Sequence, residues 1–356
     1  MENSTNKYSN NTSDVILEGT QVSIGYRSKK KEVVVHNDLN FSLHRGELTC
    51  LLGANGSGKS TLLRTLSAVQ PSLKGSITLM GKMLHEYSEK ERSRSIGVVL
   101  TEKTQTGGLT IYELVSLGRQ PHTGFFGRLN KEDKAIIEHA IEAVGITRLS
   151  ASYMAEVSDG ERQKAFIAKA LVQECPLIIL DEPTAFLDVV SRIEIMTLLR
   201  RLAIEEKKAI LLSTHDIDQA LLLADRLWLL TREKGIICGV TEDLILSNQL
   251  AQLFPDSEIR FDNLHGGFIP LQTYQHVIHL EAADEYLFHW SQNALNRIGY
   301  QCIDKTIERP ETNIPGTITS LKVSSKNELQ LTLPRETQAF SSFEELLNTL
   351  KKDTSK

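Results

Sequence analysis

The sequence has 356 residues, of which 40% are hydrophobic and 24% are charged, a balance typical of a globular protein. At roughly 150 residues per domain, this length is enough for about two domains. The formal net charge of −5 argues against a nucleic acid partner, which would favour a basic face. The four cysteines are far apart and form no CxxC pair, so we expect reduced thiols in a cytosolic protein.

No apolar stretch reaches the roughly 20 residues that a membrane-spanning helix needs. The densest one, 221–230, is interrupted by Asp225 and Arg226. Residues 1–14 are polar and rich in Asn and Ser, which predicts a disordered tail rather than a signal peptide or an anchor. We therefore expect a chain that does not cross a membrane.

From about residue 15 to 257, short apolar runs alternate with helical patterns. The runs are apolar on both faces, which suits the strands of a covered, largely parallel sheet. The helical patterns place their apolar residues on one face. Together they predict a layered α/β domain with a helical subdomain at about 107–172. The expected strands are 48–52, 96–100, 177–180 and 209–212, and the expected helices are 61–69, 135–144, 161–172 and 191–202.

After Pro255 the pattern changes, and we expect a small accessory α+β domain at 258–356. It begins with a turn at 264–267. Two interpretations of this domain stay open: an appendage for packing or dimer stabilisation, and a regulatory ligand-binding domain. Its expected strands are 276–280, 317–323 and 328–333, and its expected helices are 283–297 and 343–350.

The segment 53–61 reads GANGSGKST and lies between an expected strand and an expected helix. Glycines let the backbone turn so that several N–H groups point at phosphates, and the helix start adds a partial positive charge. Lys59 would reach the β- and γ-phosphates, and the Ser60 hydroxyl would ligate Mg²⁺. A chance match in a glycine-rich loop is the alternative, but the flanking strand and helix argue against it. The predicted nucleotide contacts are Gly53, Ala54, Asn55, Gly56, Ser57, Gly58, Lys59, Ser60 and Thr61.

Two acids, Asp181 and Glu182, end the buried run 177–180. In an open parallel sheet, ligands bind beyond the carboxyl ends of the strands. Adjacent strand residues point opposite ways, so we expect different tasks: Asp181 binds Mg²⁺ through water, and Glu182 is the general base for the attacking water. The alternative is that both merely end a strand. His215 follows the run 209–212 and is a candidate to contact the γ-phosphate or to orient the water, although a lone histidine is usually structural.

A second motif, Ser158-Asp-Gly-Glu-Arg-Gln163, opens the expected helix 161–172. Ser158 and Glu161 have the spacing of a capping box, which needs no function beyond starting the helix. The same geometry also makes an anion site.

Taken together, these motifs resemble those of ATP-binding-cassette (ABC) transporter ATPases. The resemblance covers about 15–255 and keeps the order of the family: the Walker A loop 53–60, the signature 157–163, Walker B 177–181 with Glu182, the D-loop 185–188 and the H-loop His215. It implies an ABC-type P-loop NTPase fold that hydrolyses ATP with Mg²⁺. It also implies a homodimer that sandwiches two ATP molecules, docked on transmembrane permease subunits at the cytoplasmic face of the membrane. A substrate-binding protein is then an indirect partner.

The resemblance assigns further roles. Tyr26 falls where an aromatic residue stacks on adenine, although it can also be an ordinary strand tyrosine. Ser158, Gly160 and Glu161 belong to the signature, which binds ATP held by the partner subunit. The stretch 114–121, with Arg119, and the following residues 127–129 and 132–133 resemble importers of iron–siderophores, haem or vitamin B12. Their alternative interpretation is a solvated helix surface with an Arg/Pro turn.

Two departures from the family pattern affect these expectations. Thr101 stands where a glutamine usually contacts Mg²⁺ and senses the membrane subunit; its shorter side chain would reach the metal only through water, and Glu102 or Gln105 could substitute. Asp159 stands where glycine is usual, and Glu161 where glutamine is usual. Asp159 brings negative charge near a phosphate, unless it faces away or caps the helix. A non-transport cassette protein and a nucleotide-binding regulator without hydrolysis remain the alternative functions.

Overall fold

The computed structural model describes residues 14–28, 31–100, 108–124, 127–255, 258–263, 265–304, 319–334 and 336–353. They form two compact units, Met1–Ile269 and Pro270–Lys356. Among the helices that these residues form, none combines the length and the apolar character needed to span a bilayer.

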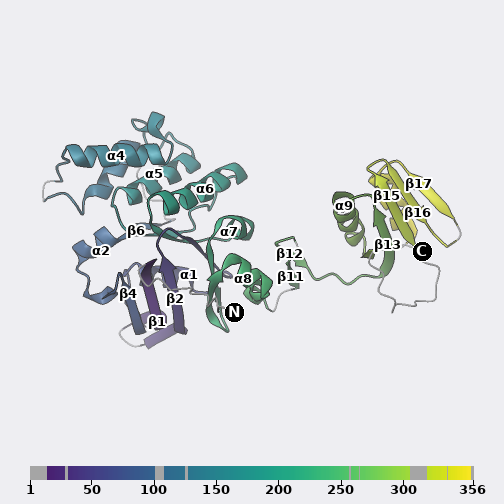
Figure 1. The fold of residues 1–356 in the computed structure, drawn as a ribbon, viewed down its shortest axis with the longest axis horizontal. Coiled ribbons are helices and arrows are strands. Elements are labelled where there is room, and N and C mark those ends of the chain that lie inside the picture. Colours follow the sequence, from purple (N-terminus) through teal and green to yellow (C-terminus); the bar gives the residue numbers. More distant parts are fainter. Residues whose placement is uncertain are drawn as a thin grey trace, which may run out of the picture. The chain divides into compact units, whose positions relative to one another are not determined.

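Two sheets organise the first unit (Figure 1). The smaller sheet is antiparallel, in the order β2-β1-β4-β5. The larger has the order β10-β9-β3-β8-β7-β6, in which only β10 runs antiparallel to its neighbour. The bounds in the smaller sheet are β1 Val15–Ser28, β2 Lys31–His44, β4 Lys74–Leu79 and β5 Lys82–Met83. Those in the larger are β3 Leu48–Leu52, β6 Ile96–Val99, β7 Leu177–Asp181, β8 Ala209–Ser213, β9 Arg226–Thr231 and β10 Gly235–Val240.

The strands of the larger sheet are buried on both faces. Successive residues of a strand face opposite sides, so Leu180 packs in one core and Ile179 in the other. The first core lies toward α3–α6, and the second lies between this sheet, the smaller sheet and α1. This double burial explains the uninterrupted apolar runs and confirms the expected α/β fold with a largely parallel sheet.

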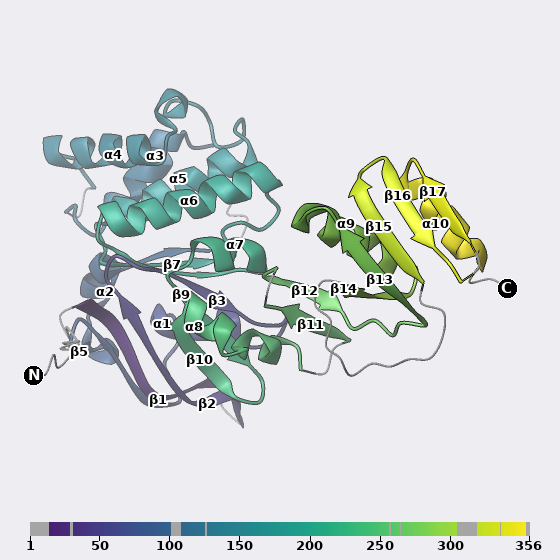
Figure 2. The ribbon, with the colours of Figure 1, turned by 45° about the vertical axis from the view of Figure 1, so that its right-hand side comes forward.

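Helices α3, α4 and α5 pack on one another, and with α6 they form a layer on one side of the larger sheet (Figures 1 and 2). We call α3, η3, α4, η4 and α5 the helical layer. The helices of the first unit are α1 Lys59–Leu66, η2 Leu84–Glu86, α2 Glu89–Ser95, α3 Ile111–Ser116, η3 Leu117–Arg119, α4 Lys131–Ala143, η4 Thr147–Leu149, α5 Asp159–Leu171, α6 Val189–Glu205, α7 Ile217–Leu223, α8 Thr241–Leu246 and η5 Gln249–Leu253.

The short hairpin of β11 (Ile259–Asp262) and β12 (Gly267–Pro270) packs against the first core. Phe261 joins the first core, and Phe268 stacks edge-on against Phe254, with their ring centroids 5.0 Å apart. The first unit therefore extends to Ile269, beyond the sequence-based boundary at residue 257, because this hairpin buries its aromatic side chains there.

The second unit is a mixed sheet with two helices, ordered β14-β13-β15-β16-β17. Side chains of one parity on three strands, such as Ile278, Leu321 and Leu329, face α9 and α10 and form one core. The expected α+β character is confirmed, whereas β14 and β17 are strands that we did not expect. The bounds are β13 His276–Ala282, α9 Glu285–Asn296, β14 Tyr300–Asp304, β15 Ser320–Ser325, β16 Glu328–Thr332, β17 Thr337–Phe340 and α10 Phe343–Asp353.

Candidate nucleotide site

The glycine-rich loop 53–58 connects β3 to α1. Gly56 and Gly58 have φ of 71° and 98°, a conformation that residues with a side chain rarely adopt. Gly58 is the N-cap of α1, and no side chain among the described residues caps the helix there. The N–H groups of the first turn are therefore available to an anion, and the helix dipole favours negative charge at this end.

The Lys59 side chain folds back over this loop. Its Nζ donates to the carbonyl oxygens of Gly53 at 2.8 Å and Ala54 at 3.3 Å, and the residue is buried. Burial lowers the pKa of Lys59, while the nearby charges of Glu182 and Asp181 raise it. The ammonium group is thus held by the loop, within range of the charges of the two acids.

Ser213, at the end of β8, connects the two acids at the end of β7. Its Oγ donates to Asp181 Oδ1 at 2.7 Å and accepts from the Glu182 backbone N at 2.9 Å. Asp181 has the same strand parity as Ile179, whose side chain packs in the core that contains α1. Asp181 accordingly lines a pocket of about 260 Å³ together with Ser60 of α1. Hydroxyl and carboxylate oxygens are ligands that Mg²⁺ prefers, so these residues fit a magnesium ion.

Glu182 and His215 face each other across the ends of β7 and β8. His215 Nε2 lies 2.7 Å from Glu182 Oε1, and 34% of the Glu182 side chain is exposed, so a water molecule can reach the carboxylate. Glu182 has φ of 49°, a left-handed conformation whose cost is typical of functional positions. Both residues line a pocket of about 290 Å³ with Ala185, Phe186 and Leu187 of the following loop.

Two side chains of the smaller sheet contact the glycine-rich segment. Tyr26 on β1 is half-exposed, and its Oη lies 2.6 Å from Thr61 Oγ1. His36 on β2 is buried, with its Nε2 2.6 Å from the Ser57 carbonyl oxygen. Because a carbonyl oxygen can only accept, His36 carries a hydrogen on Nε2.

Ser158 is the N-cap of α5, in the helical layer. Its Oγ accepts from the Glu161 backbone N at 3.3 Å, and Glu161 Oε2 accepts from the Ser158 backbone N at 2.9 Å. The Glu161 carboxylate accepts from the Ser158 backbone N–H and also from the Ser158 hydroxyl, and these two bonds, the backbone one first, lower the pKa of Glu161. Helix α5 packs in the first core and α1 in the second, so the two motifs begin helices on opposite faces of the larger sheet.

Comparison with known families gives two matches. Residues 36–185 match the ABC transporter family, and residues 275–351 match the iron ABC transporter C-terminal domain. The chain is 39% identical to an uncharacterised ABC transporter ATP-binding protein of Methanocaldococcus jannaschii, over 71% of this chain and 86% of the relative. It is 38% identical to the iron(3+)-hydroxamate import ATP-binding protein FhuC of Bacillus subtilis, over 69% of this chain and 90% of FhuC.

The chain belongs to the ATP-binding cassette family of ABC transporters. Its first unit is therefore a cassette that binds and hydrolyses ATP. Solved structures agree: a chain of an inward-facing transporter assigned to the metal-chelate type is 27% identical, with a TM-score of 0.60, over 73% of this chain and 98% of that chain. A dimeric bacterial cassette, MJ0796, is 24% identical, with a TM-score of 0.55, over 64% of this chain and 99% of that chain, and supports the fold alone.

Asp159, which stands where the family usually has glycine, forms an ion pair with a residue of its own helix, α5. Its Oδ1 accepts from Arg162 Nη1 at 2.5 Å, and Arg162 also donates to the Met154 carbonyl oxygen at 3.2 Å. The neighbouring Gly160 is tightly packed, since an added Cβ would lie 3.0 Å from Ser191 Oγ at the start of α6. Arg162 therefore offsets the negative charge of Asp159, the residue that departs from the family's usual glycine.

Two residues of the cassette's site were not expected from the sequence. Ser213 could have been found, because it continues the alternation of the buried run 209–212 on the same face as Asp181. His36 gives no such signal, since it comes from a strand that was not predicted. Thr101, Glu102 and Gln105 lie outside the described residues, so the place of Thr101 in the metal site stays a prediction.

Proposed function

We propose that this cassette works as a homodimer on the cytoplasmic face of the membrane and energises an importer of an iron–siderophore, haem or cobalamin. The observation that carries hydrolysis is the 2.7 Å contact between His215 and Glu182 at the ends of β7 and β8. The partners are transmembrane permease subunits, with a substrate-binding protein acting indirectly. No nucleic acid is involved.

In this proposal, ATP lies along the glycine-rich loop. Its phosphate oxygens replace the carbonyl oxygens of Gly53 and Ala54 as acceptors for Lys59 Nζ. Tyr26, whose hydroxyl is tied to Thr61, lies beside the loop, where it can stack on adenine. The backbone N–H groups of 54–61 and the start of α1 bind the remaining phosphate oxygens.

Ser60 and Asp181 would hold Mg²⁺, which neutralises charge on the phosphates when it is bound. Glu182 takes the proton of the attacking water on the carboxylate oxygen that His215 leaves free. His215 donates to the other oxygen from Nε2 and so orients the carboxylate. Ser213 fixes the spacing of the two acids, because it bonds the Asp181 side chain and the Glu182 backbone.

A second copy of the chain completes each site. Within one chain, the glycine-rich loop and the Ser158 motif begin helices that pack on opposite faces of the larger sheet. A head-to-tail pair would place Ser158, Gly160 and Glu161 of one copy against the ATP of the other. The MJ0796 cassette, whose fold is similar, is itself dimeric.

The substrate class rests on the second unit and on the names of relatives. The 275–351 match is to a domain of iron ABC transporters, and FhuC is an iron(3+)-hydroxamate import protein. The test is uptake of radiolabelled ferric hydroxamate by cells in which the gene is deleted and then restored. Restored uptake with the wild type but not with Glu182→Gln is expected. Equal uptake of labelled ferric hydroxamate, haem and cobalamin in the deleted and restored strains overturns the substrate class. Wild-type protein that hydrolyses no ATP overturns the transport ATPase itself.

A further inference from the structure

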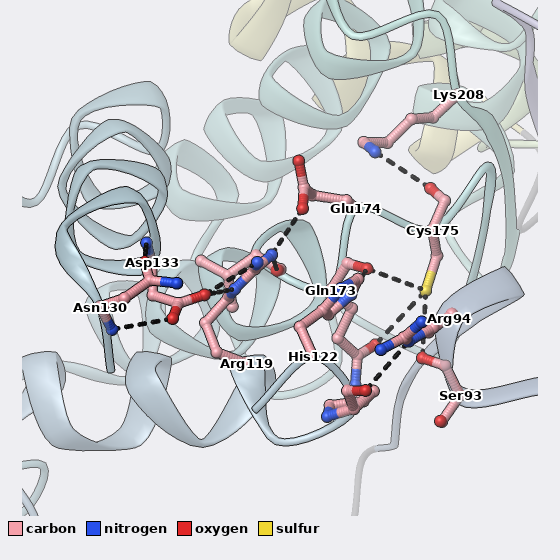
Figure 3. Close-up of polar contacts among 12 residues, drawn as sticks. Ser93, Arg94, Arg119, His122, Asn130, Asp133, Gln173, Glu174, Cys175 and Lys208 are labelled. Atoms are coloured by element: carbon pink, nitrogen blue, oxygen red, sulfur yellow. Dashed lines mark hydrogen bonds and ion pairs between the residues drawn. The ribbon is translucent and has the colours of Figure 1, made fainter. Parts of the chain in front are cut away.

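The stretch 114–121, which resembles importer cassettes, is not a solvated helix surface around Arg119. Only 5% of Arg119 is exposed, although it lies on the short η3 helix. Figure 3 shows its guanidinium group surrounded by residues of α4 and of the segment that follows α5. No role in the nucleotide site accounts for this burial.

Arg119 joins α4 to the residues that follow α5 through its guanidinium group. Its Nε and Nη2 each lie 2.9 Å from Asp133 Oδ1 on α4. Its Nη1 donates to the Val172 carbonyl oxygen at 2.8 Å and to Glu174 Oε2 at 2.6 Å, beyond the end of α5. Asp133 is also buried, and its Oδ2 accepts from the Asn130 backbone N at 3.0 Å, so both of its oxygens have donors. The pair therefore meets the conditions under which a buried ion pair is tolerated.

We call residues 172–176 the linking segment, because it connects α5 to β7. Residues next to Arg119 in the sequence contact the linking segment and the end of α5 as well. His122 Nε2 lies 2.9 Å from the Gln173 carbonyl oxygen. Gly118 lets η3 approach α5, since an added Cβ would lie 2.2 Å from the Lys169 carbonyl oxygen.

Residues of α2 and of the start of β8 in the larger sheet also contact the linking segment. Lys208 Nζ donates to the Cys175 carbonyl oxygen at 3.0 Å, and Cys175 Sγ lies 3.5 Å from the Ser93 carbonyl oxygen. The Ala209 backbone N donates to the Pro176 carbonyl oxygen at 2.9 Å. The segment is thus fixed between the helical layer and the sheet.

The linking segment lies in the chain between the Ser158 motif and the two acids Asp181 and Glu182. Helix α5 begins at Asp159, directly after its N-cap Ser158. The linking segment follows the helix, and β7 then ends at Asp181, next to Glu182. We propose that Arg119 is a positioning residue for ATP hydrolysis: it couples the helical layer to the linking segment, so that docking of α5 on the partner's ATP sets the position of Asp181 and Glu182. This inference rests on the proposed dimeric ATPase.

The test compares the full-length wild type with two variants, measuring the melting temperature and the kcat and KM of ATP hydrolysis. Arg119→Lys keeps a cation for Asp133 but loses the planar fork that reaches Val172 and Glu174 at once. Arg119→Met/Asp133→Asn removes both buried charges, so it avoids the unpaired carboxylate that would unfold Arg119→Met. Arg200→Met, which breaks the Arg200–Asp225 pair away from the linking segment, is the matched control.

For both folded variants we expect kcat to fall at least tenfold and KM to stay within about twofold, since the glycine-rich loop is untouched. The control should keep the wild-type kcat. A folded variant with wild-type kcat, or one whose loss lies only in KM, overturns the inference while leaving the proposed function intact. A wild type without ATP hydrolysis overturns both.

Discussion

His36 Nε2 lies 2.6 Å from the carbonyl oxygen of Ser57, so a side chain of the antiparallel sheet holds the glycine-rich loop one residue before Gly58. The loop must present its N–H groups inward to bind phosphates, and its glycines alone do not enforce that conformation. The His36 contact restrains the loop from the smaller sheet, whereas the loop itself follows β3 of the larger sheet.

His36→Ala should therefore weaken ATP binding more than it slows the chemical step. We expect the dissociation constant for ATP to rise about tenfold, because losing one buried hydrogen bond costs about 1–2 kcal/mol. Titration calorimetry with Glu182→Gln as the background measures binding without turnover. His44→Ala is the control on the same strand, since His44 contacts Ser42 rather than the loop. Unchanged affinity in His36→Ala would contradict the restraint.

Glu182→Gln should lower kcat by about 10²–10⁴-fold, the range typical of losing a general base, while ATP still binds. The glutamine keeps an acceptor for His215 but no longer takes a proton. Steady-state phosphate release measures the loss, and sedimentation with ATP should detect a trapped dimer. Glu205→Gln, at the exposed end of α6, controls for the loss of a carboxylate. A variant that hydrolyses ATP at the wild-type rate would remove Glu182 from the mechanism.

Ser213→Ala should reduce kcat about tenfold or more and lower the free energy of unfolding by about 1–2 kcal/mol. The change deletes the donor to Asp181 and the acceptor of the Glu182 backbone N–H together. Urea unfolding and ATPase assays measure the two effects. Ser213→Thr, which keeps the hydroxyl, should recover most of the activity, and failure to do so would indicate that packing rather than the hydrogen bonds matters.

Asp159→Asn should strengthen ATP-driven dimerisation with little change in stability. The Asp159–Arg162 pair is largely exposed, and such pairs contribute about 0–1 kcal/mol. Removing the negative charge of Asp159 should reduce its repulsion of the phosphates of ATP bound to the partner subunit. Sedimentation of the Glu182→Gln background with and without Asp159→Asn, over an ATP series, measures this. Glu156→Gln is the control near the start of α5, and weaker dimerisation of Asp159→Asn would contradict the prediction.

The stability of the first unit should fall in acid partly through Asp133. The Asn130 backbone N–H and the Arg119 guanidinium hold the pKa of Asp133 below its ordinary value of about 3.9. Because the folded-state pKa is lower than the unfolded one, this carboxylate stabilises the protein above about pH 4, and the contribution is lost as the pH falls through the folded pKa. Urea unfolding between pH 7 and pH 3 should show a shallower loss for Asp133→Asn than for the wild type. Exposed Glu138→Gln on the same helix is the control, and parallel curves for Asp133→Asn and wild type would contradict the assignment.

The sequence by itself determined the elements whose signals are local. The phosphate loop, the acids after a buried strand and the alternation of apolar runs with helical patterns depend on neighbours along the chain. They sufficed to predict a layered α/β domain, and the order of the motifs gave the resemblance to the cassette family. The same local signals also indicated an α+β second unit, although β14 and β17 were missed because they are short and only partly apolar.

Only the tertiary structure decided which distant residues meet. The pairing of β7 with β8 brings Ser213 to Asp181, and the smaller sheet brings His36 to Ser57. Burial of Arg119 depends on the packing of η3, α4 and α5, so the sequence showed only an arginine next to a turn. Such contacts depend on how the elements pack. A pattern along the chain does not show how close in space two strands or helices lie when they are far apart in the sequence.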